Sequence, residues 1–160
     1  MTHPTLGLPP PDLSRGFPDA AARLRASKTR LAGRALEIAA DRDETLTRRH
    51  DEVGLRNLLR DAEVYLERLA LSVAGDDPFW LRQFCEHTSI VYRRNLVRMD
   101  DAINLLESIR SAVRGVLSGD EPTVADRAID GGIHAFREHR KLAGDPRPRN
   151  KILWAIYKGG

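Results

Sequence analysis

The 160-residue sequence is poor in the residues that mark secreted, metal-clustered or membrane-spanning chains. Cys85 is the only cysteine, which excludes an internal disulfide and a thiolate metal cluster. Uncharged apolar runs, such as residues 69–75, fall far short of the roughly 20 apolar residues that cross a bilayer. The N-terminus also lacks an apolar signal core. We therefore expect a cytoplasmic protein.

Lysine is scarce as well, because arginine supplies most of the 26 basic residues. These arginines alternate with Asp and Glu along most of the chain, and the formal net charge is only +3. Such interleaving is typical of a solvated, salt-bridged surface, so neither nucleic acid nor membrane is an expected partner. With 41% hydrophobic and 31% charged residues, the composition is that of one soluble globular domain.

Apolar residues recur at helical spacing in most of the chain, and no segment shows the period-two alternation of a strand. The pattern predicts helices over about 19–40, 52–73, 78–93, 101–117 and 122–142, with Asp19, Asp77 and Asp100 as N-caps. Residues 41–51 are nearly all polar and predict a short exposed helix or a connection. The prediction is an all-α domain over residues 19–142, between a Pro-rich extended arm (1–18) and a basic, aromatic tail (143–160). Gly131 and Gly132 are expected to permit a close helix crossing.

Recognised catalytic motifs are absent, since there is no Gly-rich phosphate loop, nucleophile elbow or H-E-x-x-H sequence. Cys85 and His87 are near neighbours, but side chains so placed on a helix do not face each other as a nucleophile and its base must. The five histidines show no spacing that predicts a metal site, and His50 is expected to be exposed. We therefore predict a protein that is not an enzyme.

The helix predicted over 78–93 carries four of the nine aromatic residues and raises the question of a cofactor. His87 lies on this aromatic face and is either a satisfied core histidine or an axial ligand to a tetrapyrrole iron. Under the second interpretation, Trp80, Cys85, His87 and Tyr92 would surround the bound group.

The tail carries apolar residues beyond two prolines that stop a helix, where a chain is usually polar. Three interpretations are open: the tail folds back over its own domain, it docks into another subunit, or it adsorbs weakly to a membrane. Trp and Tyr beside Arg and Lys are residue types that anchor protein interfaces. The predicted partner-binding residues are Ile152, Leu153, Trp154, Ile156 and Tyr157.

Residues 59–76, LRDAEVYLERLALSVAGD, resemble the signature of phycobiliproteins, in which R-D-x-x-Y-Y-L-R leads to A-G-D. Continued through residues 75–79 and 95–107, the stretch also resembles bacterial globin-like sensor domains, which precede cobalamin-binding or stress-signalling domains. The resemblance implies a globin-like bundle of about five to seven helices. It also implies that Arg60 and Asp61 match the pair that contacts the chromophore propionate and pyrrole nitrogens.

One departure from the phycobiliprotein pattern is informative. Leu58 stands where that pattern has its bilin-attaching cysteine, which excludes covalent bilin at this site. Arg60 and Asp61 can equally be surface charges on a helix. The leading hypothesis is a non-enzymatic sensory or assembly subunit that associates with a protein partner, or with its own copies, through the tail. The alternative is a tetrapyrrole-binding protein that holds haem, cobalamin or a noncovalent bilin.

Overall fold

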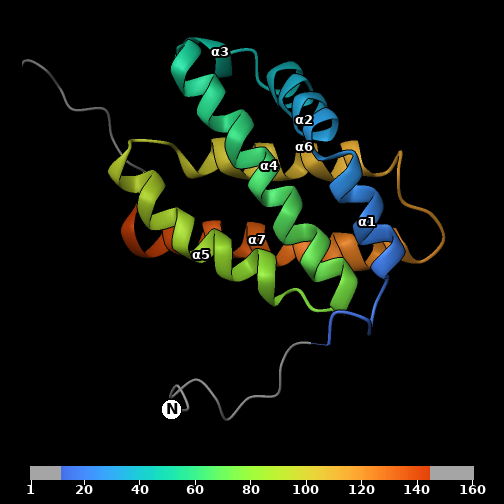
Figure 1. The fold of residues 1–160 in the computed structure, drawn as a ribbon. Coiled ribbons are helices and arrows are strands. Elements are labelled where there is room, and N and C mark those ends of the chain that lie inside the picture. The colour runs from blue at the N-terminus through green and yellow to red at the C-terminus, as the bar shows by residue number, and fades with distance from the viewer. Residues whose placement is uncertain (1–11, 145–160) are drawn as a thin grey trace, which may run out of the picture.

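The computed structural model describes residues 12–144, and these form seven α-helices and no strand (Figure 1). This confirms the prediction of an all-α bundle with five to seven helices. The predicted docking residues of the tail, Ile152 to Tyr157, lie outside the described residues. No helix within 12–144 is long and apolar enough to cross a membrane. The helices are α1 (Pro18–Ala26), α2 (Lys28–Arg42), α3 (Leu46–Arg49), α4 (Glu52–Gly75), α5 (Phe79–Arg94), α6 (Met99–Val113) and α7 (Glu121–Ala143).

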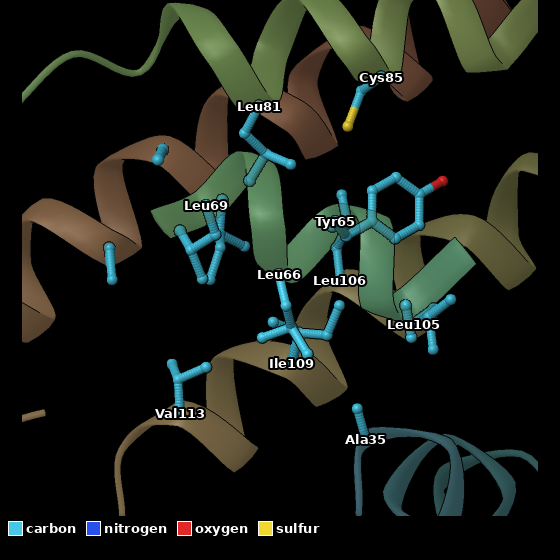
Figure 2. Packing of buried hydrophobic residues seen from close by; sticks show 14 of the residues in the cluster. Ala35, Tyr65, Leu66, Leu69, Leu81, Cys85, Leu105, Leu106, Ile109 and Val113 are labelled. Atoms are coloured by element: carbon cyan, nitrogen blue, oxygen red, sulfur yellow. The ribbon is translucent and has the colours of Figure 1, made fainter. Parts of the chain in front are cut away.

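Helix α4 is the centre of the bundle, because it packs against α1, α2, α5, α6 and α7 (Figure 1). Asp51 caps its start by accepting a hydrogen bond from the Gly54 backbone N–H at 2.8 Å. Its apolar stripe then recurs every three or four residues and is almost fully buried. Figure 2 shows this stripe between α5 and α6, with Tyr65, Leu66 and Leu69 of α4 meeting Leu81 and Cys85 of α5 and Leu105, Leu106 and Ile109 of α6.

The helix predicted over 19–40 is two helices, which meet at Ser27. Helix α1 packs on α4, whereas α2 packs on both α6 and α4. The buried residues of α1, such as Leu24, and those of α2, such as Leu31 and Ala35, therefore face different neighbours. Tertiary packing therefore divides a segment that has no proline or glycine at the break.

The polar segment 41–51 contains the short helix α3, as one of the two predicted alternatives had it. It is not wholly exposed, because Leu46 is 1% exposed and joins the core.

The N-cap predictions also need correction. Asp77 does accept a hydrogen bond from the Phe79 N–H at 3.0 Å, but Asp19 and Asp100 cap nothing. Helix α6 begins two residues earlier than the pattern suggested, so Asp101 lies within its first turn, where it is 3% exposed.

The segment 12–17, expected to be part of an extended arm, contacts the end of α4. The backbone N–H groups of Gly16 and Phe17 donate to the carbonyls of Ala74 and Val73, each at 2.9 Å. These carbonyls belong to the last turn of α4, where a helix has no intrahelical donors to offer. A Cβ on Gly16 would overlap the carbonyl oxygen of Val73, so this cap requires glycine.

Helices α5 and α7 cross closely at Gly132, which confirms the prediction that a glycine permits close approach. A Cβ built on Gly132 would lie 2.9 Å from the sulfur of Cys85 and 3.2 Å from Leu106 Cδ1. The neighbouring Gly131 has ordinary space, since its Cβ would lie 3.6 Å from that of Arg82. Only one of the two glycines is therefore required by packing.

We predict opposite effects of alanine at these two positions. Gly132→Ala overpacks the crossing and should lower the free energy of unfolding by about 1–3 kcal/mol. Gly131→Ala adds a methyl group where there is room and should gain up to about 1 kcal/mol from helix propensity. Urea denaturation of both variants checks this, and equal effects would contradict the close crossing.

Candidate functional site

A groove of about 810 Å³ lies between the first turns of α4 and the second half of α5. Residues at the end of α3 and in the loop after α5 complete its lining. Figure 1 shows the cause, because α4 and α5 are close at the turn that joins them and diverge toward α3. This volume is within the range of sites that bind small organic molecules.

The two long walls of the groove differ in chemistry. Helix α4 contributes polar groups, chiefly Asn57, Arg60 and Asp61. Helix α5 contributes the apolar side chains of Phe84 and Val91 together with the imidazole of His87. A ligand that fills the groove therefore meets hydrogen-bonding groups along one edge and an apolar surface along the other.

A chain of hydrogen bonds runs from the core to the polar wall. The Tyr65 hydroxyl donates to the Tyr92 hydroxyl at 2.7 Å, and Tyr92 donates to Asp61 Oδ2 at 2.7 Å. Burial raises the pKa of both tyrosines, so both remain neutral donors. Both tyrosine rings pack against the ring of Phe136. Tyr65 meets it edge-on, with ring centroids 6.4 Å apart, and Tyr92 stacks on it, with ring centroids 6.0 Å apart. The orientation of Asp61 is therefore set from within the core.

Asp61 and Arg60 lie close together but do not form an ion pair with each other. Burial raises the pKa of the Asp61 carboxyl, and the Tyr92 hydrogen bond and the nearby Arg60 charge offset this only in part. The Arg60 guanidinium is exposed and makes no hydrogen bond or ion pair within residues 12–144. A titratable group with a shifted pKa that lines a groove is a candidate for a functional site.

The structure brings together four of the six residues predicted to surround a cofactor: Arg60, Asp61, His87 and Tyr92 all line the groove. Cys85 and Trp80 do not. Cys85 points into the core toward Gly132, where burial raises the pKa of its thiol and makes it unreactive (Figure 2). Trp80 lies at the opposite end of α5, beside Leu13 and Asp76. The aromatic face of α5 is therefore divided between two ends of the bundle.

A buried ionic cluster, which sequence reasoning missed, supports the far end of the groove. Asp101 of α6 is 3% exposed and accepts hydrogen bonds from Arg49 Nη2 at 2.6 Å and from His50 Nε2 at 2.8 Å. Arg49 also bonds Asp43, the C-cap residue of α2, at 2.5 Å. Arg49 and His50 both line the groove, so the expectation that His50 is exposed was wrong.

One observation from the sequence and one from the structure mark the special position of Asp101 in this cluster. In the sequence, Asp101 shares a helix face with Leu105 and Ile109, which marks it as a polar residue on a buried stripe. In the structure, burial acts to raise the pKa of Asp101, but the bonds from His50 and Arg49 outweigh it and hold the pKa below its ordinary value. Hydrogen bonds from Arg49 and Thr45 likewise lower the pKa of Asp43, to about 2.

The rim of the groove holds an unusual backbone conformation at Leu96. Its φ is +59°, a left-handed value that costs a residue with a β-carbon about 1–2 kcal/mol. Asp76 is the other non-glycine residue with a positive φ in the described part of the chain. Aspartate tolerates this conformation far better than leucine does. Leu96 is also 50% exposed, so burial does not compensate for the strain.

Among residues 12–144, no group of three His, Cys, Asp or Glu side chains gathers as a metal site would require. No protein-family model, curated protein or solved structure matches the chain. The resemblance to phycobiliproteins and to globin-like sensor domains therefore stays a prediction, and the groove must be interpreted from its own residues.

We predict that the buried ionic cluster stabilises the fold against acid. Asp101→Asn should lower the free energy of unfolding at pH 7 by about 3 kcal/mol, because it leaves Arg49 and His50 without their buried partner. Asp100→Asn is the matched control. Its carboxylate is 51% exposed and pairs with Arg98 and Arg140, so the expected loss is below about 1 kcal/mol.

The pH dependence follows from the lowered pKa of Asp101. The contribution of its carboxylate is complete above the unfolded pKa of about 4 and is lost as pH falls through the lower folded value. The stability difference between wild type and Asp101→Asn should therefore shrink below about pH 4. Denaturation at several pH values measures it, and a difference that persists unchanged at acid pH would contradict this assignment.

Asp61 should behave in the opposite way. Its folded pKa is raised, so the ionised carboxylate at pH 7 reduces stability and protonation relieves the loss. Asp61→Asn keeps an oxygen that accepts from Tyr92 and should be at least as stable as wild type at pH 7. Any gain should disappear below about pH 4, where the unfolded carboxyl is protonated too. Thermal denaturation at both pH values measures this, and a clear destabilisation would show that Asp61 serves the fold.

Proposed function

We propose that this protein is a non-enzymatic sensory module that holds a propionate-bearing tetrapyrrole noncovalently in the groove between α4 and α5. The observation that carries the proposal is Arg60, which has no ion-pair partner within residues 12–144, beside the half-buried Asp61, which Tyr92 orients. Their placement at a groove of ligand size is what supports a binding role.

The polar wall is suited to the two kinds of polar group that a tetrapyrrole carries. Arg60 offers the fork of N–H donors that matches a carboxylate such as a propionate. Asp61 has one carboxylate oxygen engaged by Tyr92 and a second oxygen that accepts from a pyrrole N–H. Leu58, where a bilin-attaching cysteine would be, makes the binding noncovalent.

The apolar wall suits the apolar edge of the same ligand. Phe84 packs edge-on against Tyr65, with ring centroids 5.5 Å apart, and the Arg68 guanidinium lies over its ring at 5.4 Å. These contacts fix the ring that faces the groove. His87 is exposed on the same wall, where its imidazole is accessible to the ligand or to its metal.

Two further observations favour binding over catalysis. The one cysteine is buried with a raised pKa, and so is not available as a nucleophile. His87 has no partner among the described residues that would orient it as a general base. Association with a protein partner or with further copies, through Ile152 to Tyr157, remains part of the proposal for the output of the module.

The test is a titration of the purified protein with biliverdin, followed by visible absorption. Wild type should bind with a shift of the absorption band. Arg60→Leu should bind about tenfold more weakly, because a charge-assisted hydrogen bond to a carboxylate contributes roughly 1.5–3 kcal/mol. Arg56→Leu is the matched control: it lies one turn earlier on α4, pairs with Glu52 and does not line the groove.

The outcomes separate the parts of the proposal. Absence of any spectral change with wild type, for biliverdin and for haemin, would rule out the tetrapyrrole function. Binding that is equally weakened in the Arg60 and Arg56 variants would show a general charge effect and would remove Arg60 from the site.

A further inference from the structure

The backbone conformation of Leu96 is dictated by the way α5 ends. After the last turn, the Val97 N–H donates to the Tyr92 carbonyl at 2.9 Å, and the Leu96 N–H approaches the Arg93 carbonyl at 3.4 Å. This pair of bonds defines a helix ending in which the first residue after the C-cap, here Leu96, adopts a left-handed conformation. Glycine is the usual residue at that position. This helix ending does not require a leucine side chain, so the presence of leucine at position 96 must have another cause.

Packing within the bundle is not that cause. The Leu96 side chain is half-exposed, and it faces the groove beside Val91, which is 38% exposed. Residues with strained backbone conformations cluster at active sites, ligand clamps and switch regions. Asp76, the other non-glycine residue with a positive φ within 12–144, differs because its side chain pairs with Arg127 at 3.0 Å.

We propose that Leu96 is a ligand-contact residue that, with Val91 and Phe84, covers the apolar edge of the bound molecule. This inference rests on the proposed function and narrows the ligand class. The molecule must be a planar amphiphile with one apolar edge against the α5 wall and one polar edge against Asn57, Arg60 and Asp61. Binding then buries the two exposed apolar side chains at the rim.

The proposal requires that stability and affinity change in different directions at this position. Leu96→Gly and Leu96→Asn both relieve the left-handed strain, so their melting temperatures should equal or exceed that of wild type. Both remove the apolar contact, so their affinity for biliverdin should fall at least fivefold. Ile90→Ala is the control, because Ile90 is 48% exposed on α5 but does not line the groove. Its affinity should stay within twofold of wild type.

Each result decides the matter. If wild type binds biliverdin and both Leu96 variants bind within twofold of it, the contact role is overturned while the proposed function stands. If both variants melt at clearly lower temperature than wild type, Leu96 serves the fold and the inference fails. If the Ile90 variant weakens binding as much, the effect is non-specific adsorption to exposed apolar surface. If wild type itself does not bind, the proposed function and this inference fall together.

Discussion

The end of the bundle that contains the groove depends on the hydrogen bonds that the buried Asp101 carboxylate accepts from Arg49 and His50. Asp101 sits in the first turn of α6 and holds Arg49 and His50, while Arg49 reaches on to the end of α2. Three helices are thereby joined by groups whose charges would be costly to bury alone. The same Arg49 and His50 form one end of the groove, so the contact that secures the bundle also shapes the candidate site.

Around that support, two groove residues carry local features that disfavour the folded state. Burial raises the pKa of the Asp61 carboxyl, and Leu96 has a left-handed backbone conformation. Arg60 beside them is exposed and has no ion-pair partner within residues 12–144. The core tolerates these local losses because α4 is packed on by five other helices and its stripe is almost completely buried. Unfavourable local terms gathered at one groove are more informative about function than any single contact.

The candidate site could be predicted only in part from the sequence. Arg60 and Asp61 came from a resemblance, and His87 and Tyr92 from the aromatic character of one helix. Trp80 and Cys85 were grouped with them because helical periodicity places residues on a face but does not say which neighbour covers each end. Arg49 and His50 were missed because they lie in a polar segment without apolar periodicity. Their partner Asp101 did carry a sequence signal, because it is a polar residue on an apolar helix stripe.

By itself, the sequence determined the all-α class, the approximate extents of the later helices, and the breaks after Gly75 and around Gly119. It also indicated a close crossing at the pair Gly131 and Gly132, of which packing requires only Gly132. These features depend on local spacing and on residues whose backbone preferences act over a few positions. Only the tertiary structure decided that the first predicted helix divides at Ser27, that Asp101 rather than Asp100 has the structural role, and where α4 and α5 diverge. Those outcomes depend on contacts between segments far apart in the chain. Asp101 leaves a local signal, its place on an apolar stripe, but the identity of its partners Arg49 and His50 leaves none.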